Sequence, residues 1–340
     1  MKVLILKTSS MGDVLHTLPA LTDAMHALPG IRFDWVVEEA FAEIPAWHPA
    51  VDKVIPVALR RWRKQPWQAI ISSEWVNFWR SLRTHEYDLI IDAQGLIKSA
   101  LVTRMARGRR SGLSRASARE SWAALAYQRR YTIPKQQHAI ERVRRLFAAA
   151  LGYPMPHDTL DYGITRAQFF SEYVHASNDI VFLHGTTWPS KQWPRTYWTH
   201  LAQLATQAGF SVSLPWGNQA EYEDAQAIAG VCKNVRVLPK LSLTELGAVL
   251  ASARAVIGVD TGLAHLAAAL TVPTLTLYGA TRPDLTGTRG QAQMHLSAQF
   301  VCSPCLSRQC IYPGLSPVKP ACYQTLEPER VWNAAAQLLR

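Results

Sequence analysis

The polar loop behind the first apolar run of the chain holds side chains suited to proton transfer. It reads KTSSMGD over residues 7–13 and directly follows the run VLIL at 3–6. A loop that cradles phosphate needs several glycines, but only Gly12 is present here, and a carboxylate, Asp13, follows it. Spacing alone leaves two roles open for Asp13. It could cap a helix that begins at Val14, or it could take a proton from a substrate hydroxyl.

Two loops in the second half of the chain offer hydroxyl groups, a cation and a carboxylate. The β-rich run 179–184 is followed by Thr186 and Thr187, and Lys191 comes a few residues later. A lysine at this place would compensate charge on a departing diphosphate. Glu221, after the segment LPWG, could accept hydrogen bonds from ribose hydroxyls, although a glutamate at a helix start needs no function.

A third loop leads from a β-rich run into an Ala/Leu-rich helix predicted over 261–269. It contains Asp260, Thr261 and Gly262, with His265 one turn into the helix. Free N–H groups at a helix start favour an anion, whereas the plain alternative is that Asp260 or Thr261 is only an N-cap. The three loops together predict a nucleotide-diphosphate site formed by Thr186, Thr187, Lys191, Glu221, Asp260, Thr261, Gly262 and His265.

Basic residues follow the predicted strands of the first half. They are Arg60, Arg61, Arg63 and Lys64 after the third strand, Lys98 after the fourth and Arg119 beyond the fifth. Guanidinium forks bind carboxylates and phosphates, so these post-strand cations predict a site for an anionic ligand. A run such as RRWRK is also typical of a solvated helix face.

The elements that must position these residues are short strands alternating with helices. In the first half we expect strands at 2–6, 32–37, 53–57, 87–92 and 109–113, and helices at 14–27, 74–84 and 97–107. In the second half we expect strands at 179–184, 210–214, 235–238, 255–260 and 274–278. Such alternation predicts an α/β fold with parallel sheets, in two facing, doubly wound, Rossmann-like domains. Ligands then bind beyond the carboxyl ends of the strands, in the cleft between the domains.

Length and composition agree with two globular domains. The chain has 340 residues, which is more than a single hydrophobic core usually holds. The fractions of hydrophobic residues, 48%, and of charged residues, 18%, are those of a globular protein. We place the domains at 1–165 and 166–340, joined by a polar segment around 152–178, and the last helix could pack back on the first domain. No apolar stretch approaches the ~20 residues of a membrane span, and the N-terminal run is too short for a secretion signal. We therefore expect a cytoplasmic protein.

The net charge of +11 points to an anionic partner: nucleic acid, anionic lipid or a phosphorylated small molecule. A nucleic-acid binder would interleave aromatic residues with its cations, and RRWRK offers only Trp62, so we expect no nucleic-acid partner. A dehydrogenase is disfavoured because no G-x-G-x-x-G follows a strand.

Four of the five cysteines lie in one segment, with the spacing C-x2-C-x4-C-x11-C. They are Cys302, Cys305, Cys310 and Cys322. The spacing begins like a metal knuckle but lacks a second close pair, so two alternatives stay open: a structural metal site, or a loop of free thiols.

Several segments together resemble the bacterial lipopolysaccharide heptosyltransferases, which are GT-B enzymes. They are KTSSMGDVLHTLPALTDA, FDWVVEE, VIPVALRRWRK and DAQGLIKSALVTR in the first half, and HGTTWPSKQWP, LPWGNQAE and VDTGLAHLAAAL in the second. The match runs in order through nearly the whole chain, and its first half is most similar to the members that attach the first heptose. The resemblance implies inverting transfer of L-glycero-D-manno-heptose from ADP-heptose to the Kdo of Kdo-lipid A, in the inner core of lipopolysaccharide.

The resemblance also implies roles for the residues. Asp13 matches the position of the base, and Lys191 would assist the leaving diphosphate in a nucleotide-sugar-binding C-terminal domain. The N-terminal domain would bind the acceptor through Lys7, Ser9, Ser10, Gly12, Arg60, Arg61, Arg63, Lys64, Lys98 and Arg119. No two aspartates are separated by a single residue, so we expect no catalytic metal and no required cofactor. A lipid acceptor and a basic surface imply peripheral attachment to the anionic cytoplasmic face of the inner membrane.

One departure from the pattern of the first-heptose members leaves the identity of the acceptor open. The cysteine segment is more similar to members that add the second heptose, for which the acceptor is a heptose already attached. A less favoured alternative is a nucleotide-sugar epimerase of the same fold, which would need no basic cluster facing a lipid.

Overall fold

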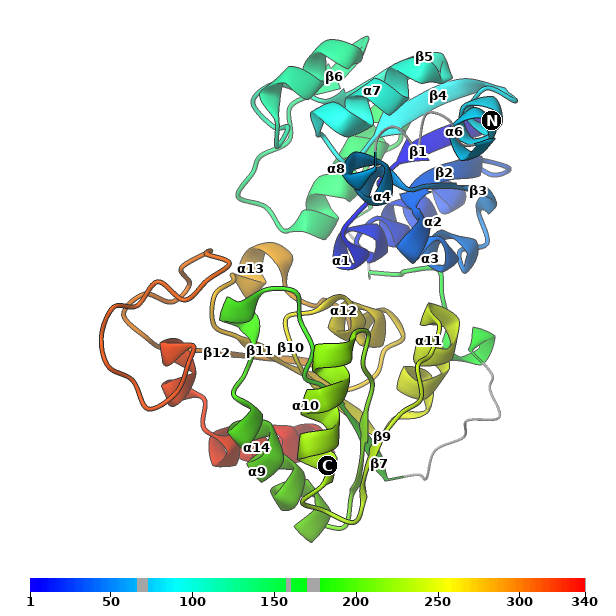
Figure 1. The fold of residues 1–340 in the computed structure, drawn as a ribbon. Coiled ribbons are helices and arrows are strands. Elements are labelled where there is room, and N and C mark those ends of the chain that lie inside the picture. Colours follow the sequence, from blue (N-terminus) through cyan, green and yellow to red (C-terminus); the bar gives the residue numbers. More distant parts are fainter. Residues whose placement is uncertain (66–72, 157–159, 170–177, 340) are drawn as a thin grey trace. The chain divides into compact units, whose positions relative to one another are not determined.

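In the computed structural model the chain divides into two compact units, Met1–Ile164 and Thr165–Arg340 (Figure 1). The structure describes residues 1–65, 73–156, 160–169 and 178–339. The segment predicted as a linker, 152–178, therefore lies partly outside the described residues. Each unit is an α/β domain built on one parallel sheet, and each is described by itself below.

The sheet of the first unit has six strands in the order β3-β2-β1-β4-β5-β6, all paired in parallel. They are β1 (Lys2–Leu6), β2 (Arg32–Glu38), β3 (Val51–Val57), β4 (Glu86–Asp92), β5 (Arg107–Leu113) and β6 (Arg129–Tyr131). The strand order reverses between β1 and β4. Such a switch point opens a crevice at the carboxyl ends of the two strands, and this is where open α/β sheets bind ligands.

Helices cover both faces of this sheet. They are α1 (Met11–Leu15), α2 (Leu18–Ala27), α3 (Glu43–Ala46), α4 (Leu59–Lys64), α6 (Ser73–Leu82), α7 (Ile97–Met105) and α8 (Ala139–Leu151), with short 3-10 turns η1 (Glu39–Phe41) and η2 (Ser121–Ala126). Helices α4, α6 and α7 share one core cluster with the side chains of Leu4, Leu6 and Val36. Helix α8 packs on α2 and contacts Phe33 through Phe147, on the opposite face.

The second unit repeats the strand order. Its sheet runs β12-β11-β10-β7-β8-β9, so that β7 is flanked by β8 and β10 as β1 is by β2 and β4. The strands are β7 (Asp179–Leu183), β8 (Ser211–Leu214), β9 (Val235–Val237), β10 (Ala255–Val259), β11 (Thr274–Tyr278) and β12 (Gln293–Ser297). Its switch point therefore lies between β7 and β10.

Five longer helices and four short ones accompany this sheet in the described residues. They are η3 (Arg166–Gln168), η4 (Pro189–Lys191), α9 (Arg195–Gln207), α10 (Gln219–Ala229), α11 (Leu243–Ser252), α12 (Gly262–Ala269), α13 (Pro283–Thr286), η5 (Ala321–Thr325) and α14 (Pro328–Leu339). The last helix, α14, packs on α9, β10 and β11 of its own unit. Whether it also packs back on the first unit stays a prediction.

All ten predicted strands are present, and two short strands, β6 and β12, were missed. The helix predicted over 14–27 is in fact two helices, because Pro19 lies in the first turn of α2. A proline deeper in a continuous helix would clash with the carbonyl one turn back, so the chain breaks at His16 and Thr17. No helix in the described part of the chain is long and apolar enough to cross a bilayer.

Candidate functional site

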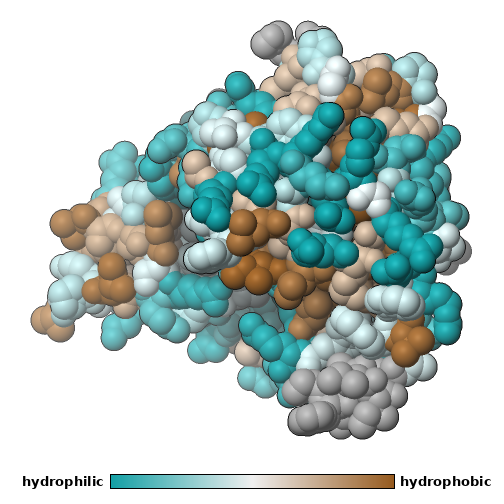
Figure 2. Space-filling model, turned by 90° about the horizontal axis from the view of Figure 1, so that it is seen from above, coloured by the Kyte–Doolittle hydropathy of each residue, from teal (hydrophilic) through white to brown (hydrophobic). Residues whose placement is uncertain are grey.

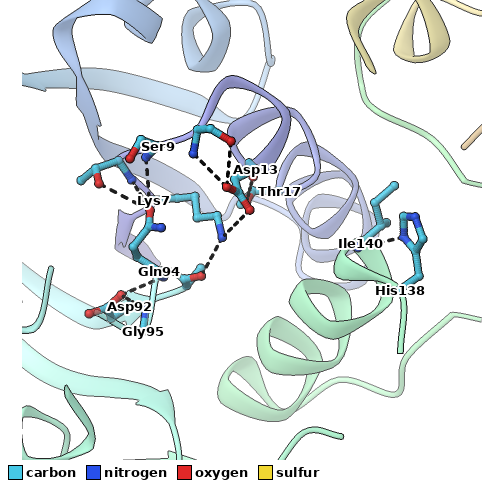
Figure 3. Close-up of polar contacts among 12 residues, drawn as sticks. Lys7, Ser9, Asp13, Thr17, Asp92, Gln94, Gly95, His138 and Ile140 are labelled. Atoms are coloured by element: carbon cyan, nitrogen blue, oxygen red, sulfur yellow. Dashed lines mark hydrogen bonds and ion pairs between the residues drawn. The ribbon is translucent and has the colours of Figure 1, made fainter. Parts of the chain in front are cut away.

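Two loops meet at the switch point of the first unit, one after β1 and one after β4. The side-chain oxygen of Gln94 accepts the backbone N–H groups of Thr8 at 2.9 Å and Ser9 at 3.2 Å (Figure 3). Asp92 in turn accepts the N–H groups of Gln94 and Gly95. The second loop therefore fixes the first. Sequence reasoning missed Gln94 and Asp92, although Asp92 ends the strand predicted over 87–92 and Gln94 lies directly beyond it.

Asp13 lies in the first turn of α1, at the centre of this site. Its Oδ2 atom accepts the backbone N–H of Ser10 at 2.8 Å and the Ser10 hydroxyl at 3.0 Å. Its Oδ1 atom lies 3.6 Å from the ammonium of Lys7, and the side chain is still 39% exposed. The N-cap of α1 is Ser10, so the alternative that Asp13 caps a helix starting at Val14 is wrong. Asp13 nevertheless takes part in the cap of α1, because its Oδ2 atom accepts the N–H of the N-cap residue Ser10.

The charge of Asp13 is fixed by its neighbours. Burial would raise the pKa of this carboxyl, but Lys7, the two hydrogen bonds from Ser10 and the charge of Arg119 outweigh burial and hold the pKa below its usual value. Asp13 is therefore a carboxylate at neutral pH, as a proton acceptor must be.

Lys7 has a positioning role in this arrangement. It is buried, and its ammonium donates to the carbonyl of Ala93 at 3.1 Å while it faces Asp13. Lys7 thus joins the loop after β1 to the loop after β4. Ser9 and Ser10 are more exposed than Lys7, and Gly12 is buried in α1.

The predicted cations do not form a single cluster. Arg61 is already paired with two carboxylates, Glu39 at 2.9 Å and Glu74 at 2.9 Å. The Arg60 side chain stacks over the ring of Phe41 at 5.5 Å, and Arg63 and Lys64 are exposed on α4. The exposed Arg119 is the predicted cation whose charge acts on Asp13, and Lys98 lies in the first turn of α7, after the same β4 loop.

A buried glutamate ties α4 to the loop of Asp13. The backbone N–H of Glu38 donates to the carbonyl of Thr8 at 3.1 Å, and its carboxylate accepts the N–H of Arg60 at 2.9 Å. The start of the basic helix is therefore fixed next to the loop after β1. Glu38 directly follows the strand predicted over 32–37, and this position was the signal that could have found it.

Arg119→Ala should raise the KM for an anionic acceptor about tenfold, because a charge-assisted hydrogen bond is worth roughly 1.5–3 kcal/mol. The variant also removes one charge that lowers the pKa of Asp13. Arg61→Ala is the matched control, and we expect its acceptor KM to stay within about twofold of the parent, since Arg61 already binds two carboxylates. Initial-rate kinetics at varied acceptor concentration measure both. Equal effects of the two substitutions would contradict this assignment.

The switch point of the second unit holds a buried carboxylate with three polar neighbours. Asp260 Oδ2 accepts hydrogen bonds from the ammonium of Lys191 at 2.7 Å and from the hydroxyl of Thr281 at 2.7 Å. His265 Nε2 lies 3.6 Å from the other oxygen. Burial would raise the pKa of Asp260, but His265 and Lys191 outweigh it and hold the pKa far below its usual value. Asp260 is not an N-cap, because Thr261 occupies that position of α12.

Lys191 is therefore ion-paired, and a second cation lies near it. Its ammonium is matched by Asp260 and lies 4.7 Å from the ring centroid of Trp188. A second cation, the guanidinium of Arg308, lies 5.5 Å from the same ring. Arg308 was missed, since its place in the cysteine segment gives no signal in the sequence. It adds positive charge beside the loop after β7.

Glu221 joins the loop after β8 to the loop after β7. Its carboxylate accepts the N–H of Gly217 at 2.7 Å, while Asn218 caps the start of α10. A Cβ atom built on Gly185 would lie 2.5–2.8 Å from the carboxyl atoms of Glu221. The glycine therefore allows the Glu221 carboxyl to lie against the backbone of the loop after β7, which continues with the half-buried Thr186 and the exposed Thr187.

Gly185→Ala should raise the KM for a nucleotide donor about tenfold, with little change in stability. The new methyl group would push the Glu221 side chain away, and this flexible chain can move at little cost to the fold while it loses its own hydrogen-bonding position. Gly230→Ala is the matched control, because there a Cβ meets its nearest atom at an ordinary 3.4 Å. Donor titration by calorimetry and thermal melting separate the two effects. A lower melting temperature with unchanged donor affinity would contradict this view.

The four clustered cysteines line one small pocket of about 10 Å³, together with Ser190. Burial raises the pKa of Cys322 to about 12 and also raises that of Cys302. None of the four is in a disulfide, and in the part of the chain that the structure describes no three metal-binding side chains are grouped to hold an ion. The segment is fixed to the loop of Lys191 by Ser190, whose hydroxyl donates to Ser307.

Comparison with known proteins finds matches along nearly the whole chain. The family model described as glycosyltransferase family 9 (heptosyltransferase) matches residues 75–316. Lipopolysaccharide heptosyltransferase 1 of Pseudomonas aeruginosa is 53% identical over 97% of this chain and 96% of its own length. Lipopolysaccharide heptosyltransferase 2 of Escherichia coli is 26% identical over 84% of this chain and 85% of its own length.

Solved structures agree with these matches. The E. coli heptosyltransferase WaaC with ADP is similar at a TM-score of 0.88 and 46% identity, covering 99% of this chain and 100% of that one. The same enzyme with ADP-2-deoxy-2-fluoro heptose has a TM-score of 0.85 at 45% identity, covering 99% of each chain.

Proposed function

Because this chain belongs to glycosyltransferase family 9, the heptosyltransferases, we propose that it transfers heptose from ADP-heptose to the Kdo of Kdo-lipid A. The observation that carries the proposal is an ionised Asp13 at one switch point, in a chain 53% identical to a lipopolysaccharide heptosyltransferase 1. The ADP and fluoro-heptose analogue in the WaaC structures support the donor. Transfer to a heptose already attached is less supported, since the second enzyme is only 26% identical.

The acceptor half of the reaction belongs to the first unit in this proposal. The acceptor hydroxyl attacks the anomeric carbon of the donor from the side opposite the diphosphate, so the configuration inverts. As the new C–O bond forms, the hydroxyl becomes acidic and its proton passes to Oδ1 of Asp13. Oδ2 stays bound to Ser10 throughout and holds the carboxylate in place.

The donor half belongs to the second unit. As the bond from the anomeric carbon to the diphosphate oxygen breaks, negative charge collects on the diphosphate. The N-terminus of α12 and the cations Lys191 and Arg308 stabilise that charge. Glu221 accepts hydrogen bonds from the ribose, and Thr186 and Thr187 bind phosphate oxygens through their hydroxyls.

Transfer should proceed undiminished in excess EDTA. The cations that stabilise the diphosphate in this proposal belong to the chain itself, so no divalent ion is required. Initial rates with EDTA, and with added Mg²⁺ after EDTA treatment, measure this. A rate that falls with EDTA and returns with Mg²⁺ would refute the metal-independent mechanism.

One assay tests the function itself. The protein is incubated with ADP-heptose and either Kdo-lipid A or an acceptor that already bears one heptose, and the products are weighed by mass spectrometry. We expect a mass gain of one heptose on Kdo-lipid A. Gain only on the heptosylated acceptor would assign the second transfer instead, and gain on neither would refute the proposal.

A lipid acceptor requires access to a membrane surface. In this proposal the enzyme acts as a peripheral protein at the anionic cytoplasmic face of the inner membrane, and its net charge of +11 favours such a surface.

A further inference from the structure

Exposed apolar side chains of the first unit are concentrated on one helical layer. Of the seven large apolar side chains that are exposed among its described residues, six lie on α6, α7 and η2. They are Val76, Trp79, Ile97, Leu101, Trp122 and Leu125; Leu101 is 61% exposed and Trp122 69%. Figure 2, which looks down on Figure 1 from above, shows hydrophobic groups set among hydrophilic ones on the surface. Single exposed apolar residues need no explanation, but such a concentration marks an interaction surface.

These side chains share one layer because of how the helices pack. Helices α4, α6 and α7 cover the same face of the sheet through a common core cluster, and η2 packs on α7. The buried side of α7 is made of small residues such as Ser99 and Ala100, so Ile97 and Leu101 point outward one turn apart. Burial of the small side chains leaves the large ones in solvent, the reverse of an ordinary surface helix.

The same layer is strongly basic. Helices α4, α6 and α7 and the segment 114–126 contain nine basic residues and two acidic ones: Arg60, Arg61, Arg63, Lys64, Arg80, Lys98, Arg104, Arg115 and Arg119, against Glu74 and Glu120. Both carboxylates are occupied, Glu74 by Arg61 and Glu120 by the N–H of Ile97 at 2.7 Å. Two tryptophans carry a guanidinium at the ring, Arg83 on Trp79 and Arg115 on Trp122. Apolar groups and tryptophans set among an excess of cations are the composition of membrane-surface helices.

The layer continues directly into the acceptor site. The N–H of Glu120 donates to the carbonyl of Gly95, in the loop that holds the loop of Asp13. Arg119, whose charge acts on Asp13, is the neighbouring residue. A bilayer against η2 and α7 would therefore place its headgroups beside the entrance used by the acceptor.

We infer that the outer face of α6, α7 and η2 docks on a bilayer of anionic phospholipid, inserting Leu101 and Trp122 between the headgroups. This inference rests on the proposed function, because a lipid-anchored acceptor is what makes docking at this place useful. The cations attract the anionic headgroups, and the apolar side chains insert into the interface between headgroups and acyl chains.

The test is flotation of the full chain with vesicles of phosphatidylcholine alone or with phosphatidylglycerol, at low and high salt. We expect binding to the anionic vesicles that weakens with salt. Leu101→Glu/Trp122→Glu should bind these vesicles at least about tenfold more weakly. Val301→Glu/Leu315→Glu is the matched control: it adds the same charge at two exposed apolar positions of the second unit and should bind as the parent does.

Activity separates docking from chemistry. The Leu101/Trp122 variant should lose transfer to Kdo-lipid A in vesicles but keep the parent rate on a deacylated, water-soluble acceptor. Because both positions are exposed, we expect an unchanged melting temperature; should the variant fold poorly, Arg80→Gln/Arg104→Gln must show the same loss of vesicle binding at low salt. Three outcomes bear on the inference and the proposed function. Equal vesicle binding by the parent and the Leu101/Trp122 variant, or an equal loss of binding in the Val301/Leu315 control, would overturn the inference. So would a parent dimer that this variant dissociates, since a second copy would then cover the face. A parent that binds vesicles but heptosylates no acceptor would refute the proposed function alone.

Discussion

Replacing Asp13 with asparagine should lower the rate of heptose transfer about a thousandfold while donor affinity and fold stay unchanged. General base catalysis contributes roughly 10²–10⁴ in rate, and an amide cannot take the proton. The asparagine oxygen can still accept the two hydrogen bonds that Oδ2 accepts from Ser10, so the end of α1 stays closed. Single-turnover transfer rates and donor titration measure the two quantities separately.

The capping role of Asp13 needs its own control. Asp13→Ala removes both the base and the acceptor for Ser10, and should cost about 1 kcal/mol of stability in addition to the rate. Ser10→Ala removes the hydroxyl bond and leaves the carboxylate, so it should keep most of the rate. An Asp13→Asn enzyme that retains more than a tenth of the parent rate would show that Asp13 serves the helix alone.

Replacing Asp260 with alanine should destabilise the second unit by about 3–5 kcal/mol and abolish donor binding. The substitution leaves the ammonium of Lys191, only 16% exposed, without its matching charge, and an uncompensated buried charge costs this much. It also removes the acceptor for Thr281 and the partner of His265. Urea denaturation followed by tryptophan fluorescence measures the stability, and calorimetry with ADP measures the binding.

A double variant tests whether the unmatched charge of Lys191 causes the loss of stability. Lys191→Met/Asp260→Ala removes both charges and should regain much of the lost stability without regaining donor binding. A double variant no more stable than Asp260→Ala would mean that the cost comes from packing and not from the unmatched charge.

The pH dependence of stability gives a second readout on Asp260. Its folded-state pKa is lowered, so its contribution to stability is fully present above the unfolded value of about 3.9 and is lost as the pH falls toward the folded pKa. The parent should therefore lose stability in acid below about pH 4. The Asp260→Ala protein should lose less over the same range.

Most strands could be predicted because they are short apolar runs bounded by polar residues, although β5, RGRRSGL, is largely polar. The two missed strands lack this signal: β6 is Arg129-Arg130-Tyr131 at one edge of its sheet, and β12 is a half-buried edge strand whose pattern is QMHLS. Edge strands meet a neighbour on one side only, so less of their sequence must be apolar. Short apolar runs in the sequence therefore predict the interior strands of a sheet better than its edge strands.

The candidate site could be predicted where a residue follows its own strand, as Asp13 and Asp260 do. The predicted site residues already included several of their partners, Lys7, Ser10, Lys191 and His265, but not Gln94 or Thr281. Gln94 fixes the loop of Asp13 from 85 residues away, and Thr281 reaches Asp260 from 21. The ion pairs of Arg61 with Glu39 and Glu74 also gave no signal in the sequence.

The repeated strand order has a consequence for how specificity can change. Each candidate carboxylate is held by residues of its own unit: Asp13 by Ser10 and Lys7, and Asp260 by Lys191 and Thr281. Under the proposed function, the first unit chooses the acceptor and the second unit chooses the donor, so we expect the two choices to be separable in evolution. A chimera that takes its first 164 residues from a relative with another acceptor should keep its nucleotide sugar and change only the molecule that receives it. Diversification of the family can then proceed by exchanging halves as well as by point substitution.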